Sequence, residues 1–269
     1  MNFIAGYCRQ VFGGLFTPFV LCWRHISLMR MLLRREVADR TSGTLLGLLW
    51  PLVQPTLQVA GFWFLFDIVY GMRLNRGPSF LAHLLIGMLP WLCLTEVLVR
   101  SASMFREFSA VYRRTPFPIE ILPIVLMCIP GMIYTVVFTL TMGALFGVFA
   151  AFKAVVVVPL VLVWLMPLIL IASVLGLFLR DFAQALPFIM MLLLYCTPIL
   201  YFPDMMPPPV RQWLWINPFS DLVAVIGQWV QGVPIAWHAL ARLVGLWLLL
   251  LGPAWLLFRR SLPHVREVL

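Results

Sequence analysis

Long apolar segments recur along the whole sequence, and most of them reach the length of a helix that crosses a lipid bilayer. Backbone N–H and C=O groups in lipid must bond to one another, so such segments fold as helices. Hydrophobic residues make up 63% of the 269 positions and charged residues 11%, which is too little polar surface for a water-soluble protein. The sequence therefore predicts an all-α membrane protein with six transmembrane helices, at residues 44–70, 80–99, 124–152, 154–179, 186–202 and 239–258.

The loops between these segments are short, so the chain has room for one membrane domain and for no separate soluble domain. We expect a single domain over residues 1–269, with a cytoplasmic interfacial segment at 1–43, a six-span bundle at 44–258 and a cytoplasmic tail at 259–269. The apolar run at 11–23 is too short to cross, and no small-residue cleavage site follows it. It favours an amphipathic helix in the membrane interface over a signal peptide.

The net charge of +9 lies mostly in alternate loops. Lys and Arg concentrate before Arg40, between Arg100 and Arg114, and after Phe258, whereas the intervening loops carry few. Because basic loops stay on the cytoplasmic side, this pattern places both termini in the cytoplasm. The basic residues form separate clusters beside the membrane rather than one continuous face, which argues against nucleic-acid binding.

Each predicted span contains proline, which leaves a helical carbonyl without its usual N–H donor. Those carbonyls need partners, so we expect the helices to pack in an assembly rather than stand singly in lipid. The third and fourth spans are predicted to form a hairpin with its turn at Lys153. The pairs Gly143 with Gly147 and Ala172 with Gly176 would let neighbouring helices approach closely.

Residues 180–218 interrupt the pattern of plain spans. Arg180 and Asp181 form a charged pair that marks a membrane surface, and the apolar run after them contains Pro187 and Pro198. The aromatic and proline-rich remainder is too polar and too broken to stay in lipid. We expect the chain to turn back near the far membrane surface in short re-entrant helices, the alternative being a kinked span followed by a plain loop.

Glu96 is an acidic residue inside an apolar run, where a carboxylate must be paired, neutralised or close to water. Arg100 follows it by one helical turn, at the spacing where two side chains meet. The spacing predicts a Glu96–Arg100 bridge at the inner membrane surface, and a role for Glu96 in transport is the alternative.

The loop at 101–123 contains the sequence R-R-T-P-F-P-I-E. Prolines on both sides hold Phe117 in an extended segment, and Arg113, Arg114 and Glu120 flank it. An exposed aromatic residue among charges is typical of a docking surface for a cytoplasmic partner. The alternative is a simple reversal between two helices.

The sequence shows no pattern of a catalytic or metal site. The nucleotide-binding G-x-x-x-x-G-K-[ST], the zinc motif H-E-x-x-H and the hydrolase motif G-x-S-x-G are absent, and histidines and cysteines are scattered. We expect no catalytic residue, metal or cofactor on this chain. A membrane transferase that uses Asp204, Asp221 or His238 is conceivable, although no spacing supports it.

Aromatic residues gather between Tyr195 and Trp215, where they could stack on sugar rings. The alternative is the ordinary belt of Trp and Tyr at a membrane surface.

Six short motifs occur in order along the chain and together resemble a known family. They are L-G-L-L-W-P-L-V-Q-P at 46–55, G-M-L-P-W at 87–91, F-P-I-E-I-L-P at 117–123, L-R-D at 179–181, T-P-I-L-Y at 197–201 and N-P at 217–218. They resemble the membrane subunit of type-2 ABC exporters for bacterial polysaccharides, most of all the O-antigen permeases, with capsule and teichoic-acid permeases as relatives.

This resemblance implies a permease in the bacterial inner membrane that pairs with a second copy of itself and with two copies of a separate cytoplasmic ATPase. ATP and Mg would bind to the ATPase, and the cargo would be a lipid-linked polysaccharide. A drug or small-lipid exporter of the same superfamily, and the membrane transferase, are the alternatives. Because few charges line the spans, we expect a neutral or weakly charged polymer.

The resemblance also implies roles for particular residues. The contacts to the ATPase would be Arg34, Arg35, Glu36, Arg113, Arg114, Phe117, Pro118 and Glu120. The first and fifth spans would line the glycan channel through Trp63, Phe66, Tyr70, Phe188, Tyr195 and Tyr201. The periplasmic gate would contain Phe202, Trp213, Trp215 and Asn217, and three successive prolines at 207–209 make that segment stiffer than a simple helix pair.

Overall fold

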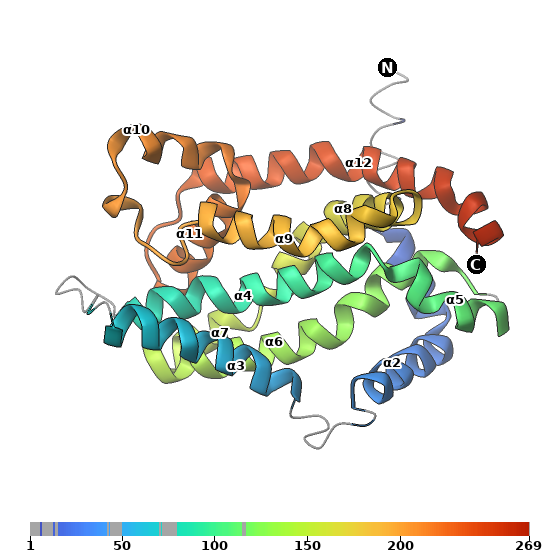
Figure 1. Cartoon of the computed structure of the whole chain (residues 1–269), viewed down its shortest axis with the longest axis horizontal. Helices are drawn as coiled ribbons and strands as arrows, with labels where there is room; N and C mark the ends of the chain where they lie inside the picture. Colours follow the sequence, from blue (N-terminus) through green and yellow to red (C-terminus); the bar gives the residue numbers. More distant parts are fainter. Residues whose placement is uncertain are drawn as a thin grey trace.

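The computed structural model describes residues 6, 13, 16–41, 43, 50–69, 71, 80–114 and 117–268, and this part of the chain is helical without strands. Figure 1 labels the helices, and their labels are kept below. The longer helices are α2 (Ile26–Thr41), α3 (Trp50–Trp63) with its π-helical continuation η2 (Phe64–Val69), α4 (Phe80–Ser101), α5 (Met104–Arg114), α6 (Leu122–Phe146), α8 (Val157–Phe178), α9 (Arg180–Cys196), α11 (Pro218–Gln231) and α12 (Trp237–Val268). The shorter elements are η3 (Ile119–Ile121), α7 (Val148–Ala154), η4 (Pro203–Met205), α10 (Pro208–Arg211) and η5 (Gln212–Ile216).

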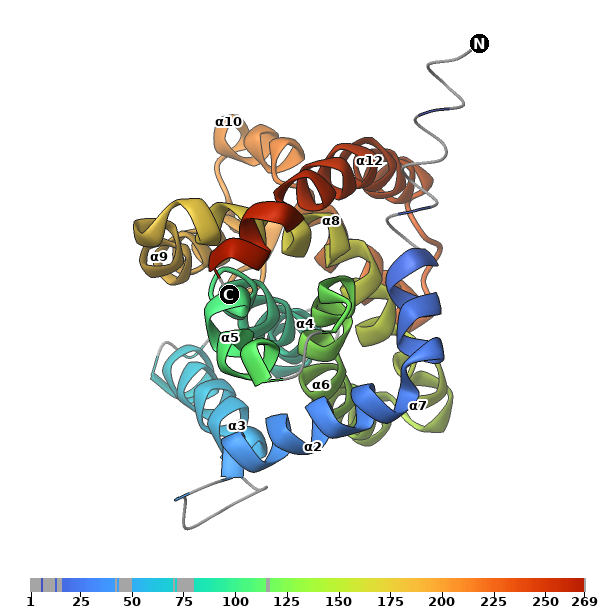
Figure 2. The ribbon, with the colours of Figure 1, turned by 90° about the vertical axis from the view of Figure 1, so that its right-hand side faces the viewer.

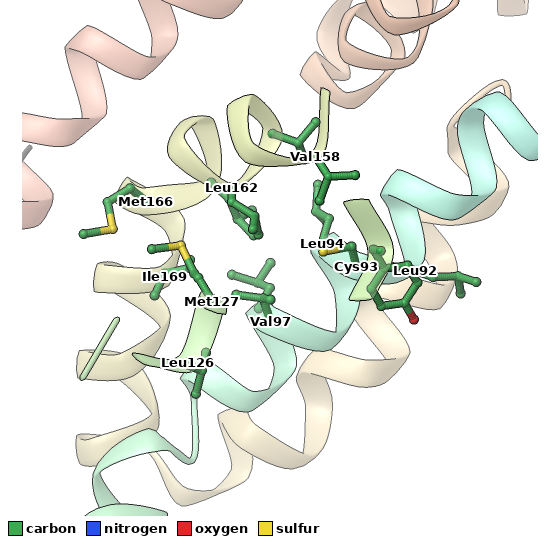
Figure 3. Close-up of a cluster of buried hydrophobic side chains, with 14 of the residues drawn as sticks. Leu92, Cys93, Leu94, Val97, Leu126, Met127, Val158, Leu162, Met166 and Ile169 are labelled. Carbon is green, nitrogen blue, oxygen red and sulfur yellow. The ribbon is translucent and has the colours of Figure 1, made fainter. Parts of the chain in front are cut away.

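Helices α4, α6 and α8 form the centre of the molecule. Figure 3 shows their side chains meeting in one apolar cluster, with Leu94 and Val97 from α4, Met127 from α6, and Leu162 and Ile169 from α8. Helix α12 packs along α8, and α2 and α5 lie with the C-terminus at one end of the bundle while α10 and α11 lie at the other (Figure 1). Helix α4 contains Pro90, which lowers its intrinsic helix propensity, but most of its residues are buried. Packing against neighbouring helices therefore stabilises it.

Four helical segments in the described part of the chain are long and apolar enough to cross a membrane. They are Phe80–Ser101, Ile119–Phe146, Val148–Phe178 and Trp237–Val265. Two shorter helices fall on the other two predicted spans: α9 has 17 residues, and α3 with η2 runs through residues 50–69. Helix α12 extends well beyond residue 258, so most of the predicted tail continues the last helix.

The turn between the third and fourth predicted spans is not at Lys153. Helix α6 ends at Phe146, and Gly147 adopts a φ of 86°, a conformation that favours glycine because it has no Cβ. The short α7 then packs back along α6 and contains Lys153 in its last turn. Gly147 therefore makes the reversal instead of a helix-packing face, and a Cβ at Gly143 would lie 3.1 Å from the Cβ of Ala151 on α7.

The carbonyl freed by Pro167 has a partner on a neighbouring helix. Pro167 has no N–H to donate to the Val163 oxygen four residues earlier, and the indole Nε1 of Trp247 on α12 donates to that oxygen at 2.9 Å. In the opposite direction, Trp164 Nε1 on α8 donates to the Leu243 oxygen on α12 at 3.1 Å. These two bonds join α8 to α12 within this one chain.

Gly176 allows α8 to touch the backbone at the junction of α4 and α5. A Cβ on Gly176 would lie 1.9 Å from the carbonyl oxygen of Ala102, which is far inside van der Waals contact. The small residue expected there for helix packing is therefore required by a backbone contact rather than by another side chain.

Candidate substrate path and coupling surface

Five charged side chains from α2, α4 and α5 meet at one end of the bundle, and we call them the charge cluster. Arg40 donates from Nε to Glu36 Oε1 at 2.8 Å and from Nη2 to Glu96 Oε1 at 2.6 Å. Arg100 donates to both carboxylate oxygens of Glu36, with 3.1 Å between Nη2 and Oε2, and to Glu107 Oε2 at 2.9 Å. Glu36 therefore connects an arginine of its own helix to one of α4.

The predicted Glu96–Arg100 bridge is wrong, because each residue has another partner. Glu96 pairs with Arg40, which lies 56 positions away in the sequence, and Arg100 pairs with Glu36 and Glu107. Helix α2 supplies a cation to Glu96, so the acid inside the apolar run is neutralised from outside its own helix. Local spacing indicated that Glu96 needs a partner but could not identify a partner on a distant helix.

Only 6% of the surface of Glu36 is exposed, and this burial alone would raise the pKa of its carboxyl. Hydrogen bonds and charges from Arg100 and Arg40 outweigh that burial and hold the pKa of Glu36 below its ordinary value. The charge cluster contains three carboxylates and two guanidinium groups, so it presents no surplus of positive charge to an anion.

A polar cavity of about 550 Å³ lies beside the charge cluster, between α3, α4, α6 and α9. Its walls combine amide, hydroxyl, carboxylate and aromatic groups, a set that can bond sugar hydroxyls and stack on sugar rings. The Thr95 hydroxyl oxygen is buried and has no hydrogen-bond partner among the described residues. The polar and aromatic residues of the wall are Arg40, Trp50, Gln54, Gln58, Thr95, Glu96, Arg100 and Tyr134.

Three of the residues expected in the channel, Trp63, Phe188 and Tyr195, lie on α3 and α9, which border this cavity, but they do not line it. Phe188 and Tyr195 point outward from α9, with 67% and 53% of their surface exposed, and Trp63 is exposed at the end of α3. Tyr201 is half-buried after α9. The side chain of Phe66 and all of Tyr70 lie outside the described residues. The cavity residues Gln54, Gln58 and Thr95 were missed because isolated amides and hydroxyls in apolar runs carry little sequence signal.

Phe117 is not the exposed aromatic residue that the sequence predicted. Its ring is only 8% exposed and contacts Tyr112 of α5 edge-on, with 5.5 Å between ring centroids. The following residues Ile119 and Ile121 are also buried, so the start of α6 folds this segment onto the bundle. Arg113 and Arg114 are exposed at the end of α5, whereas Pro118 and Glu120 are half-buried.

A groove of about 370 Å³ runs between α2 and α5 at the end of the bundle that faces the viewer in Figure 2. We call it the α2–α5 groove. Met31, Leu32, Ala110 and Val111 form its apolar floor, and Arg35 and Arg114 flank it. Arg35 also pairs with Asp39 at 3.3 Å. Of the other two predicted contacts on α2, Arg34 is exposed and Glu36 belongs to the charge cluster. The groove is lined by residues of two segments that the sequence predicted to dock the partner.

The predicted gate segment consists of the short elements η4, α10 and η5. Trp213 and Trp215 are largely exposed, whereas the ring of Phe202 packs on His83 of α4 with 4.3 Å between ring centroids. Asn217 has a structural role: its side chain accepts from the Phe219 amide at 3.0 Å and caps α11. Its Nδ2 also donates to Thr197 Oγ1 at 2.9 Å, which ties the end of α9 to the start of α11.

The remaining predicted charged residues are dispersed. Arg180 and Asp181 are both exposed in the first turn of α9, and no ion pair joins them in the part of the chain that the structure describes. Asp204 pairs with Arg211 at 2.9 Å, and Asp221 pairs with Arg242 at 2.5 Å. Among the described residues, no three His, Cys, Asp or Glu side chains gather as metal ligands would.

Comparison with known proteins shows which family this chain matches. The family model described as ABC-2 type transporter matches residues 27–250. Two proteins of Klebsiella pneumoniae named O-antigen export system permease protein RfbA are 26% and 24% identical over 208 residues, which is 75% of this chain and 78% of each relative. A protein of the same name from Myxococcus xanthus is 27% identical over 184 residues, 66% of this chain and 70% of its own length.

Proposed function

The chain belongs to the ABC-2 type transporter family, and we propose that it is the membrane half of an ATP-driven exporter for a lipid-linked polysaccharide of the O-antigen kind. Its relatives are named as O-antigen export permeases, which supports a glycan as cargo. The observation that carries the proposal is the polar cavity, because amide, hydroxyl and aromatic groups between otherwise apolar helices suit sugar and not a lipid chain.

In this proposal six helices cross the bacterial inner membrane. Helix α3 with η2 and helix α9 are the two spans beyond the four long apolar segments, and both termini lie in the cytoplasm. A second copy of the chain completes the channel, with the exposed aromatic residues of α3 and α9, Trp63, Phe188 and Tyr195, on the shared face. The segment with Trp213 and Trp215 would close its periplasmic mouth.

Two copies of a cytoplasmic ATPase supply the energy in this proposal, and they carry the ATP and Mg. Each would dock on the α2–α5 groove, where an apolar floor between two arginines can take an apolar side chain flanked by acids. The charge cluster then connects that surface to α4 and to the wall of the polar cavity, since Arg40 and Arg100 belong to both. A neutral glycan fits best, because the cluster has more carboxylates than guanidinium groups.

Purification of the tagged chain in mild detergent tests the proposal first. We expect an ATPase subunit in equal amount, vanadate-sensitive hydrolysis, and ATP-dependent uptake of lipid-linked O-antigen into inverted membrane vesicles. The paired variant Gln54→Ala/Gln58→Ala should lower uptake at least tenfold without loss of the ATPase, whereas Gln231→Ala on α11 should leave uptake unchanged.

Two results would overturn the proposal: a chain that purifies without any ATPase, or uptake that is insensitive to both glutamine changes. Uptake of capsule or teichoic-acid precursors in place of O-antigen would keep the transporter and replace its cargo.

A further inference from the structure

A second hollow lies at the end of the bundle opposite to α2 and α5, and its lining differs completely from that of the polar cavity. It has a volume of about 440 Å³ and runs between α8, α11 and α12; we call it the apolar groove. Every described residue that lines it is aliphatic or tryptophan. Leu160 and Val244 on its rim are exposed, so the groove opens outward rather than into the core.

The walls of the apolar groove are fixed by three tryptophans whose indole N–H groups are all bonded to backbone carbonyls. Trp164 and Trp247 make the reciprocal bonds between α8 and α12, and Trp229 of α11 donates to the Lys153 oxygen at 3.0 Å. The rings cannot swing inward to fill the hollow without breaking these bonds, so the groove stays open. With their polar atoms satisfied, the indoles present only apolar faces to an occupant.

Lys153 places a positive charge at one end of this groove. Its carbonyl bonds to the groove residue Trp229, and its Nζ lies 3.1 Å from the position a Cβ would take on Gly232, just past the end of α11. The two carboxylates of the described residues at this end, Asp204 and Asp221, are paired with Arg211 and Arg242. In the part of the chain that the structure describes, Lys153 has no acidic partner.

We propose that the apolar groove and Lys153 form a binding site for one anionic phospholipid of the bilayer, with an acyl chain in the groove and the phosphate on the Lys153 ammonium. A groove whose few polar atoms are already hydrogen-bonded offers nothing to water or sugar, and the bilayer supplies acyl chains at high local concentration. The cation at the end of the groove selects anionic over zwitterionic head groups, by about fivefold for one lysine at a membrane surface.

Lys153 has a competing role, since a cation beside the C-terminal end of α11 is also stabilised by the helix carbonyls. That role alone predicts lower stability on removal of the charge and no preference among lipids. The two roles therefore differ in a measurement of lipid selectivity, which does not depend on what the chain transports.

Native mass spectrometry of the full chain, purified with whatever subunits accompany it and incubated with phosphatidylglycerol or phosphatidylcholine, tests the proposal. We expect one retained phosphatidylglycerol with about fivefold preference over phosphatidylcholine. Lys153→Gln should abolish the preference and Lys153→Arg should keep it. Leu160→Trp and Val225→Trp, which fill the groove, should reduce retention of both lipids at least fivefold, whereas Val136→Trp on the exposed face of α6 should not.

Equal retention of the two lipids by the unaltered chain would overturn the proposal. A Lys153→Gln variant that unfolds more easily but keeps the preference would show that Lys153 serves only the end of α11. Leu160 is exposed at the rim, so its variant stays informative if the change at half-buried Val225 prevents folding.

Discussion

Glu36 is the residue on which the charge cluster depends, because two arginines bond to its one buried carboxylate. Without Glu36, Arg40 would keep only Glu96 and Arg100 only Glu107 among the described residues, so each guanidinium would lose the hydrogen bonds it donates to this carboxylate. Asp39, one turn away on α2, pairs with Arg35 at the surface, where an ion pair contributes little to stability, and therefore serves as a comparison.

The ionisation of Glu36 should make the stability of the chain depend on pH. Its pKa in the folded chain lies below the ordinary 4.5, so the ionised carboxylate stabilises the fold above that pH and the stabilisation is lost as pH falls through the lowered pKa. We expect Glu36→Gln to reduce stability near neutral pH by about 2 kcal/mol and to flatten the loss of stability in acid. Thermal unfolding of the detergent-solubilised chain between pH about 7 and about 3 measures both. Asp39→Asn should behave like the unaltered chain, and an equal effect of the two changes would contradict the role of Glu36.

Gly176 makes a second prediction at this scale. A methyl group there would overlap the Ala102 carbonyl, so Gly176→Ala should destabilise the chain by about 2 kcal/mol or more, despite the better helix propensity of alanine. Gly245 on α12 is a matched control, since a Cβ at that position meets nothing within 4 Å. Thermal unfolding should separate the two variants by several degrees, and similar curves would rule out the backbone contact.

At the scale of the element, the bonds between α8 and α12 depend on a proline. Trp247→Phe removes the indole N–H that replaces the missing N–H of Pro167 at the Val163 oxygen. Trp164→Phe costs less, because the Leu243 oxygen keeps the backbone N–H of Trp247, four residues further along α12. We expect Trp247→Phe to destabilise the chain by about 1–2 kcal/mol more than Trp164→Phe. Adding Pro167→Ala to Trp247→Phe restores an N–H donor to the Val163 oxygen and should recover part of the loss. Chemical unfolding in mixed micelles measures the three variants, and no recovery would contradict the argument.

The sequence predicted elements better than it predicted contacts. Apolar length alone located the four long membrane helices, and proline content indicated that freed carbonyls require partners. The turn at Gly147 and the burial of Phe117 were missed, because both depend on how α7 and the start of α6 pack on helices already in place. For the same reason, Glu96 was known to need a cation, but Arg40 could be identified only once α2 lay beside α4.

At the scale of the whole molecule, α2 and α5 lie at the end of the bundle that faces the viewer in Figure 2. The α2–α5 groove and the charge cluster are at this end, and the polar cavity adjoins the charge cluster. A force applied to α2 or α5 would reach α4 through Arg40 and Arg100 without passing through the apolar core. Because Phe117 is buried, a charged residue there would disturb packing as well as docking. The exposed rim of the groove gives a cleaner test of coupling.

Arg114 and Arg106 are both exposed arginines of α5, but only Arg114 flanks the α2–α5 groove. We expect Arg114→Glu to reverse the charge offered to an ATPase, and so to lower both ATPase co-purification and ATP-driven glycan uptake at least tenfold. Arg106→Glu should change either quantity less than twofold. Thermal unfolding should be the same for both variants, because neither side chain is buried. Equal losses from the two changes would mean that the net charge of this end, rather than the groove, attracts the ATPase; loss of uptake with full co-purification would place Arg114 in the transmission of movement after docking.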